Sequence, residues 1–448
     1  MGGLNYDVII IGAGLSGTYF AKKLVKNNFK VLLLEKSSDV TVGKKIDLFL
    51  INDGEFIRHD LHRPVAGDPE FAMEFGSNAL ASIDNSKKID FQSHIMGVHF
   101  DKYLRYLHKE VLDTGLAEIR FEAQFKDFIY EDDKIVGVKY SKNYFDENYI
   151  SEYAKLVIDC TGVDGVGRTK LPDSYGIYNK PLTDDEKFFV IMHYLKINNV
   201  EDFSNNRIWP NHFAFMAPTD MVNQKYVAIG STGGFLKAED AYDNMLKMFK
   251  LPENVELKIQ KGVIPYRQPL TSFVGDNLII AGDAASTTKP YIAAGFDALA
   301  SMIDLSMPTV TDCLKSGDCS KEKLWPINVK YALSKGRTYA YMRTIIFRLI
   351  NSSSIKDSTS LFDLPILKHI VNRYNYHNRS ISLFALFYIK LCIISRVVTK
   401  RISKEFYKDY CAAYEICKEF NALFAEYPTD PKKYAAWDKA AQSIIKKI

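Results

Sequence analysis

Cysteine pairs are missing from this chain of 448 residues. Its six cysteines form neither a Cys-x-x-Cys pair nor a regular frame; they are Cys160, Cys313, Cys319, Cys392, Cys411 and Cys417. Secreted disulfide scaffolds and zinc sites place their cysteines in such patterns. We therefore expect free thiols in a reducing compartment, without a functional disulfide.

A strong charge of one sign is also missing. The chain carries 58 Lys and Arg residues against 54 Asp and Glu residues, which leaves a formal net charge of +4. Domains that bind nucleic acid usually carry a clear basic excess. The small surplus gives no argument for a nucleic-acid partner, and we predict none.

We also expect neither a leader peptide nor a membrane-spanning run. The apolar residues 6–11 follow the start of the chain closely and form too short a run for a leader. Residues 383–394 are mostly apolar, but Lys390 interrupts them, and a spanning helix needs about 20 predominantly apolar residues. We expect a cytoplasmic protein that does not cross a membrane.

What is present is the composition of a globular protein. Hydrophobic residues make up 47% of the chain and charged residues 25%, which excludes a disordered polymer. A length of 448 residues exceeds one ordinary hydrophobic core. The sequence therefore predicts two or three domains.

A glycine-rich turn near the start carries the first chemical signal. Residues 6–11 are typical of a buried parallel strand and run into Gly12-Ala13-Gly14-Leu15-Ser16-Gly17, beyond which the sequence has helical character. Gly12 permits a tight turn, Gly14 lets backbone amides approach a pyrophosphate, and Gly17 lets the helix pack closely on the strand. The start of the helix would then face two phosphates.

The following strand supports this interpretation. The strand predicted at residues 30–34 is apolar from Val31 to Leu34 and is followed by Glu35. Glu35 lies close to the roughly 20-residue offset at which a carboxylate binds a ribose hydroxyl. A glycine turn without a ligand is the alternative, because such spacings also arise by chance. The strand, turn, helix, second strand and acid follow in order, however, and this order favours a dinucleotide.

A second strand ends in a turn at residues 154–168. The strand pattern of residues 154–159 stops at Gly162, where the backbone can approach a ligand, and Asp164, Gly165 and Arg168 follow. This pattern resembles the Asp-Gly fingerprint of flavoprotein hydroxylases. The resemblance implies an aspartate near the cofactor pyrophosphate and an arginine that supports the turn.

A third strand ends at Gly282-Asp283-Ala284-Ala285, and Gly295 starts a new helix shortly afterwards. The Asp283 carboxylate can accept a hydrogen bond from a ribityl hydroxyl, and helix-start amides at Gly295 can stabilise negative charge on a reduced flavin ring. The alternative role for Asp283 is that of a helix N-cap.

Together the three motifs resemble those of p-hydroxybenzoate hydroxylase-like flavoproteins, and within that superfamily the chain most resembles the geranylgeranyl reductase family. Residues 262–269, residues 42–46 and the Phe-Asp-x-x-Leu segment at residues 100–104 add to this resemblance. It implies FAD as the cofactor. It also implies an α/β fold: a Rossmann-like FAD-binding domain, an inserted antiparallel-sheet substrate domain and a helical C-terminal region.

The chain departs from the family at several positions. Residues 213–218 replace the substrate motif Tyr-x-Trp-x-Phe-Pro, of which only the aromatic character and the proline survive. Phe213 and Phe215 either line an apolar substrate cavity or are ordinary core positions of a strand. Asp47 stands where many members carry a cysteine, which argues against a redox-active thiol beside the flavin.

We predict an FAD-binding domain from residues 1–170 and 264–310, an inserted substrate sheet at residues 171–263, and a helical region at residues 311–448. The helix near residues 380–398 is interpreted in two ways. It is a buried helix that caps the substrate cavity, or a surface helix that dips into lipid and brings basic residues to anionic headgroups. The last segment, residues 427–448, is interpreted as a peripheral tail.

The motifs and the resemblance together define the predicted site. The predicted cofactor-binding residues are Gly12, Gly14, Leu15, Ser16, Gly17, Glu35, Lys36, Lys45, Ala123, Gly162, Asp283, Ala284 and Gly295. The predicted substrate-binding residues are Phe213, Phe215, Pro218, Tyr266 and Tyr291. The candidate proton donors are Tyr266, His193, His212 and Tyr291, none of which is assigned as catalytic. No metal site is predicted.

The predicted function is an FAD-dependent oxidoreductase that reduces C=C bonds of an apolar, isoprenoid or lipid-like substrate by hydride transfer from flavin N5. The alternative is a flavin monooxygenase that hydroxylates an aromatic or polyketide-like substrate, because both reactions use the same cofactor cradle. A noncatalytic flavin-binding scaffold is a third hypothesis. No second dinucleotide fingerprint occurs in the sequence, so NAD(P)H or another external donor is expected to bind only transiently.

Overall fold

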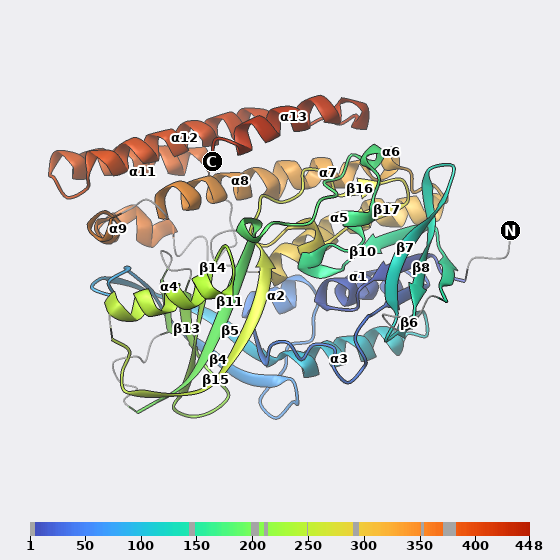
Figure 1. The fold of residues 1–448 in the computed structure, drawn as a ribbon, viewed down its shortest axis with the longest axis horizontal. Coiled ribbons are helices and arrows are strands. Elements are labelled where there is room, and N and C mark those ends of the chain that lie inside the picture. Colours follow the sequence, from blue (N-terminus) through green and yellow to red (C-terminus); the bar gives the residue numbers. More distant parts are fainter. Residues whose placement is uncertain are drawn as a thin grey trace.

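A computed structural model describes residues 5–142, 148–198, 206–209, 214–248, 250–289, 295–350, 354–370 and 382–448. Two sheets lie side by side beneath a row of C-terminal helices (Figure 1). Helices α1 and α3 pack beside the first sheet, and helix α4 packs on one face of the second. This arrangement confirms the predicted α/β class.

The first sheet has six strands in the described residues, in the order β16-β17-β10-β1-β2-β6. Their bounds are β1 Val8–Ile11, β2 Val31–Leu34, β6 Ala117–Arg120, β10 Leu156–Asp159, β16 Val274–Gly275 and β17 Leu278–Ile280. Strand β1 pairs in parallel with β2 and β10, and β10 pairs in parallel with β17. These strands are buried on both faces, which is why each reads as a continuous apolar run.

Three helices pack on this sheet or against one another beside it: α1 Leu15–Lys26, α3 Phe100–Leu112 and α5 Phe296–Ser316. Apolar residues recur at three- and four-residue spacing along α3, and its side chains Tyr103, Leu107 and Val111 are buried. Helix α5 runs past residue 310, so the boundary placed there falls inside a continuous helix.

The second sheet is antiparallel for the most part and larger than residues 171–263 alone predict. Its order is β15-β11-β14-β13-β12-β4-β5-β3. The strands are β3 Leu48–Asn52, β4 Phe71–Ala81, β5 Lys88–His99, β11 Lys187–Ile197, β12 Asn206–Trp209, β13 Ala214–Pro218, β14 Gln224–Ser231 and β15 Asn254–Pro265. Strands β3 to β5 come from residues 48–99, which the sequence analysis placed in the FAD-binding domain. They join the sheet through a parallel pairing of β4 with β12.

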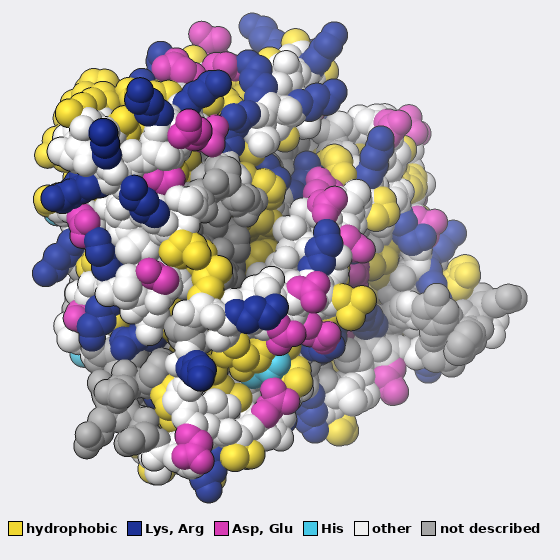
Figure 2. Space-filling view, turned by 60° about the vertical axis from the view of Figure 1, so that its left-hand side comes forward, with side chains coloured by type: hydrophobic (Ala, Val, Ile, Leu, Met, Phe, Trp, Pro, Cys, Tyr) yellow, Lys and Arg dark blue, Asp and Glu magenta, His cyan; other side chains and the backbone are white. Residues whose placement is uncertain are grey.

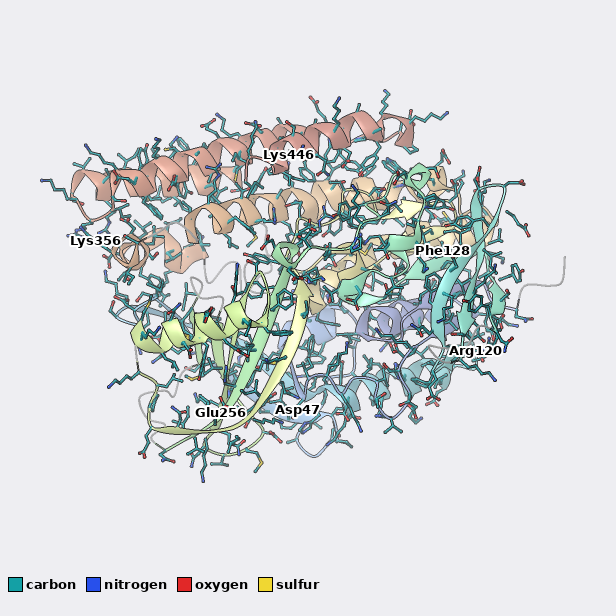
Figure 3. The ribbon with its side chains drawn as sticks, in the orientation of Figure 1. Asp47, Arg120, Phe128, Glu256, Lys356 and Lys446 are labelled. Carbon is teal, nitrogen blue, oxygen red and sulfur yellow. The ribbon has the colours of Figure 1, made fainter. Side chains whose placement is uncertain are left out.

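This sheet is curled, because residues at its two outer strands touch. Asp47, which precedes β3, accepts a hydrogen bond of 2.7 Å from Gln260 Nε2 of β15 and forms an ion pair with Lys258. Figure 3 labels Asp47 and also Glu256, which lies near the start of the same strand, β15. The concave face is apolar and includes Met192, Tyr226 and Leu48. The other face packs against α4, Phe235–Met248.

A small meander completes the N-terminal part. Strands β7 Gln124–Glu131, β8 Lys134–Ser141 and β9 Ile150–Tyr153 pair in antiparallel fashion. All six cysteines are free, as expected.

The C-terminal region is helical, as predicted. It contains α6 Lys321–Leu324, α7 Pro326–Tyr331, α8 Arg337–Ile345, α9 Ile355–Leu361, α11 Leu383–Val398, α12 Lys404–Ala425 and α13 Tyr434–Ile445. The interpretation of residues 427–448 as a peripheral tail is wrong. Tyr434 and Trp437 are buried in the main core, and Tyr427 Oη donates a hydrogen bond of 2.5 Å to the carbonyl of Thr271. Aromatic side chains, rather than the lysines around them, decide where this segment lies.

Helix α11 lies at the surface. Only Leu386 and Ile393 of its side chains are buried, whereas Phe384 is 76% exposed and Val398 is 77% exposed. The structure therefore contradicts the interpretation as a buried helix and agrees with a surface helix. Among the described residues, no helix combines the length and apolar character needed to cross a bilayer.

Candidate cofactor site

The three turns predicted to bind one cofactor lie at the same edge of the parallel sheet. Strand β1 is adjacent to β10, and β10 is adjacent to β17, with Ile11 in register with Asp159 and Asp159 with Ile280. Parallel strands end at a common edge, so the turns that follow them are brought together. Segments that are far apart in the sequence thus form one site.

Close backbone contacts confirm that the turns meet. A Cβ atom on Gly12 would lie 2.5 Å from the carbonyl oxygen of Cys160, at the end of β10. A Cβ atom on Gly282 would lie 2.1 Å from Ser16 Oγ, which belongs to the first turn. Only glycine fits at either position. Ser16, in the first turn, therefore lies directly against Gly282 of the third motif.

The first turn has the geometry that its glycines predict. Gly12 adopts a φ of +101°, and a Cβ atom on Gly17 would lie 1.9 Å from the carbonyl oxygen of Gly12. In front of Gly14, by contrast, no protein atom of another segment lies within 4 Å of the added Cβ. Helix α1 begins at Leu15 without a side-chain capping bond. This open helix start fits a pyrophosphate.

Glu35 lies beside the turn and is buried. Its Oε2 accepts a hydrogen bond of 3.0 Å from the amide of Ala13, and its Oε1 accepts one of 2.8 Å from the amide of Ser37. Carboxylate oxygens can accept further bonds, so a ribose hydroxyl remains compatible with this arrangement. The amide of Ala123 donates to the carbonyl of Glu35 at 2.8 Å, which brings Ala123 next to it. Lys36 and Lys45 are exposed.

Arg168 connects the second turn to the third. The Asp159 carboxylate, fully buried, accepts hydrogen bonds from the amides of Thr161 at 2.9 Å and Arg168 at 2.6 Å. The guanidinium of Arg168 donates to the carbonyl of Ala284 at 3.1 Å. This confirms the supporting role expected of the arginine. Gly162, with a φ of +74°, has open space in front of it.

Asp283 lies in the short helical turn Gly282–Ala285, where it caps no helix. Its Oδ1 accepts a hydrogen bond of 2.9 Å from Thr288 Oγ1, and burial raises the pKa of the carboxyl group. The structure thus contradicts the N-cap alternative. Gly295 precedes α5 without a side-chain cap and with open space before it.

The predicted substrate residues are only partly described. Phe213, Tyr291 and the candidate acid His212 lie outside the described residues. Phe215 lies on the concave face of the curled sheet, with its ring 5.6 Å from that of Tyr226. Pro218 ends the same strand, β13.

Tyr266 and His193 lie in different surroundings. The Tyr266 ring is buried between Phe188, at 4.9 Å, and Phe347, at 5.2 Å, and burial raises its pKa well above the ordinary range. His193 packs on the opposite face of the sheet, stacked on Tyr242 at 3.8 Å, with Nδ1 2.7 Å from Glu256. Because it points to α4, His193 is ruled out as a proton donor on the concave face.

Two features of the site were missed by the sequence analysis. Tyr194 lies on the concave face and donates a hydrogen bond of 2.8 Å to Gln260 Oε1. Strand β11 is apolar and buried almost throughout, so its sequence gives no signal for the orientation of Tyr194. The other is a buried ion cluster around His59, which no local pattern indicates.

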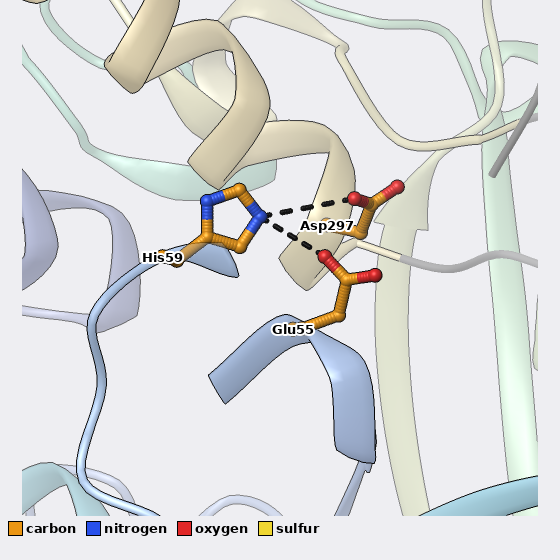
Figure 4. A group of neighbouring side chains, drawn as sticks. All are labelled: Glu55, His59 and Asp297. Atoms are coloured by element: carbon orange, nitrogen blue, oxygen red, sulfur yellow. Dashed lines mark hydrogen bonds and ion pairs between the residues drawn. The ribbon is translucent and has the colours of Figure 1, made fainter. Parts of the chain in front are cut away.

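Figure 4 shows the centre of that cluster, where one ring nitrogen of His59 faces both Glu55 and Asp297. His59 Nε2 is 3.0 Å from Glu55 and 3.8 Å from Asp297, and Nδ1 is 2.6 Å from Asp304. The three ligand-type side chains of Glu55, His59 and Asp297 lie close enough to hold a metal ion. Arg58 already pairs with both carboxylates, however, so an ion network explains the group better than a metal site.

Known proteins resemble this chain in sequence and in fold. Residues 10–46 match the model of the NAD(P)-binding Rossmann-like domain, which spans the glycine turn and Glu35. Digeranylgeranylglycerophospholipid reductase of Sulfolobus acidocaldarius is 22% identical over 99% of this chain and 98% of its own length.

Two solved structures show the same architecture. A geranylgeranyl bacteriochlorophyll reductase-like protein of Thermoplasma acidophilum has a TM-score of 0.70 and 16% identity, over 83% of this chain and 96% of that one. The p-nitrophenol 4-monooxygenase of Pseudomonas putida has a TM-score of 0.61 and 16% identity, over 82% and 93%. Together these likenesses confirm the predicted flavoprotein fold and the resemblance to the geranylgeranyl reductase family.

Proposed function

We propose that this protein is an FAD-dependent oxidoreductase that reduces carbon–carbon double bonds of an apolar, isoprenoid-like lipid. The observation that carries the proposal is the convergence of three distant turns on one edge of the sheet. The match over nearly the full length to a protein named as a reductase of this kind supports the choice of reaction.

The residues at this edge fit FAD. Gly14 and the start of α1 would hold the pyrophosphate, Glu35 the adenosine ribose, Asp283 the ribityl chain and Gly295 the ring. Open space at Gly14, Gly162 and Gly295, next to glycines that are tightly packed, supports this assignment. When bound, FAD supplies a hydride for transfer to the substrate. We propose NAD(P)H or another external donor as the transient source of electrons.

The concave face of the curled sheet would hold the substrate. Its apolar side chains exclude water, as a substrate of hydrocarbon character requires. Phe215 and Pro218 belong to this wall, and Tyr266 packs on Phe188, which lies on the same face of β11 as Met192. We keep Phe213 and Tyr291 as proposed substrate residues, and Tyr266 as a candidate proton donor.

An anaerobic experiment tests the reaction. The FAD-loaded protein is reduced chemically, mixed with a geranylgeranyl lipid, and followed at the visible flavin band. Reappearance of the band together with the loss of one C=C bond of the lipid per reduced FAD is the expected result. The proposal is overturned if the lipid leaves the band bleached, and rapid reoxidation in air through a transient near-ultraviolet band would establish the monooxygenase instead.

We also propose a peripheral contact with an anionic membrane through α11. Six exposed apolar side chains recur along this helix at three- and four-residue spacing: Phe384, Phe387, Tyr388, Leu391, Ile394 and Val398. Residues 382–404 contain five basic residues and no acidic residue. Figure 2 shows exposed hydrophobic side chains bordered by Lys and Arg in the upper part of the molecule, the height at which the C-terminal helices lie. Such a face suits a lipid surface.

Sedimentation with vesicles tests this contact. We expect the protein to sediment with phosphatidylglycerol vesicles but not with phosphatidylcholine vesicles, and to be released by about 1 M salt, at which the Debye length falls to about 3 Å. Phe384→Ser combined with Leu391→Ser should abolish sedimentation. The matched control, Val222→Ser with Leu236→Ser, changes exposed apolar residues elsewhere and should have no effect. Sedimentation of the α11 variant as complete as that of the wild type would contradict the contact.

A further inference from the structure

A buried ion pair joins the two ends of the segment that precedes α5. Lys289 follows the Gly-Asp motif, and Asp297 lies in the first turn of α5, on either side of residues 290–294. Lys289 Nζ pairs with Asp297 Oδ2, and each side chain is only 8% exposed. The pair therefore holds the end of the Gly-Asp motif at a fixed distance from the first turn of α5.

Asp297 also connects α5 to α2, Asp53–Arg58. Arg58 lies 3.3 Å and His59 Nε2 lies 3.8 Å from Asp297 Oδ1. Asp304, two turns further along α5, holds His59 Nδ1 at 2.6 Å. Charged contacts at Asp297 and, two turns later, at Asp304 thereby hold one face of α5 against the end of α2. Because a broken buried pair is costly, this arrangement resists movement of the helix.

The cluster carries more positive than negative groups. Its three carboxylates are Glu55, Asp297 and Asp304, and its four cations are Lys23, Arg58, His59 and Lys289. Burial alone would lower the pKa of His59, but the surrounding carboxylates outweigh it and raise this pKa to about 10. Lys335 also faces Asp297 and Lys289. The imidazole is thus positive at neutral pH, and the balance around Lys289 stays positive.

We propose that Lys289 and Asp297 form an electrostatic clasp for the flavin ring, with Lys289 as a positioning residue that also favours the reduced form. The inference rests on the proposed function, which puts the ring at the start of α5. A reduced flavin carries additional negative charge, and a buried cation stabilises it more strongly than a solvated one. The backbone amides at the start of α5 also stabilise negative charge on the ring, as Lys289 does.

Lys289 and Asp297 carry opposite charges, so removing one or the other should shift the flavin potential in opposite directions. A merely structural role would not produce shifts of opposite sign. Lys289→Met removes a positive charge and should make the midpoint potential of the bound FAD more negative. Asp297→Asn removes a negative charge and should make it more positive. We expect each change to reach a tenfold shift in the two-electron equilibrium, which corresponds to about 30 mV.

Spectroelectrochemistry of the FAD-loaded full-length protein measures the potential, and fluorescence titration measures the affinity for FAD. Lys289→Arg should restore most of the wild-type potential, and Lys418→Met, at an exposed ion pair on α12, should leave it unchanged. Unchanged potentials in both cluster variants, or shifts of the same sign, would overturn the clasp. Failure of the wild-type protein to bind FAD would instead overturn the proposed function.

Discussion

At the scale of single residues, Gly14 and Gly17 have different tasks although they share one motif. A Cβ atom at position 17 meets the backbone of Gly12, whereas one at position 14 meets only open space. Gly17 is therefore required for the packing of α1 on β1, whereas we propose that Gly14 is required for the ligand. This distinction leads to opposite predictions for two similar substitutions.

We predict that Gly14→Ala leaves the free energy of unfolding unchanged but weakens FAD binding at least tenfold, since the methyl group occupies the approach to the pyrophosphate. Gly17→Ala should lower the free energy of unfolding by about 1–3 kcal/mol, the usual range for overpacking. Urea unfolding of the FAD-free protein and fluorescence titration with FAD measure the two effects. Equal destabilisation by both substitutions would contradict the assignment.

His59 gives a prediction for the dependence of stability on pH. Its pKa is raised to about 10 in the folded protein, from an ordinary value of 6.5. A raised pKa stabilises the fold below the unfolded pKa, and this contribution is lost as the pH rises through the folded pKa. His59→Gln should therefore cost about 3 kcal/mol at pH 6 and progressively less towards pH 10. Urea unfolding at pH 6, 8 and 9.5 checks this, and a constant difference between the proteins would argue against a charged imidazole.

Residue patterns in the sequence predict part of the site. The glycine turn and Glu35 follow from motifs because each lies directly after a buried strand, and Arg168 and Asp283 belong to turns that follow such strands. The cluster around His59 does not follow, since His59 and Asp304 are 245 residues apart in the chain. Only packing of α5 on α2 brings them together, and no short spacing encodes that contact.

At the scale of secondary-structure elements, the type of strand decides what the sequence reveals. The parallel strands β1, β2, β10 and β17 are buried on both faces and read as continuous apolar runs. Strand β5, in contrast, alternates between buried and exposed residues over most of its length. That signal is weaker, and assigning the strand to the second sheet requires its pairing with β4, which is a tertiary property.

Helix α13 leads to a prediction about the C-terminal region. Trp437 is buried, donates a hydrogen bond of 2.8 Å to the carbonyl of Leu423, and packs 4.6 Å from the ring of Tyr427. Trp437→Ala should lower the free energy of unfolding by about 3–5 kcal/mol, as expected for a buried tryptophan. Lys439→Ala, at an exposed position of the same helix, is the matched control. If the tryptophan variant unfolds at the same urea concentration as the control, the segment is a tail after all.

At the scale of the whole molecule, the proposed site lies at one edge of the parallel sheet, and we propose that the concave face of the curled sheet covers the reactive end of the cofactor. The Asp47 contacts to Gln260 and Lys258 hold the outer strands of that curl together. The C-terminal helices add the Tyr427 contact to Thr271, in the loop that leads to the Gly-Asp motif. Each part of the chain thus contributes to the surroundings of one site.

Binding of FAD to the purified full-length protein tests this arrangement most directly. Titration of the FAD-free protein, followed by flavin fluorescence and the visible spectrum, should give one FAD per chain. The same titration of Gly14→Ala should show at least tenfold weaker binding with an unchanged far-ultraviolet circular dichroism spectrum. A folded wild-type protein that binds no FAD would contradict the account, because the three turns would then converge without a ligand to hold.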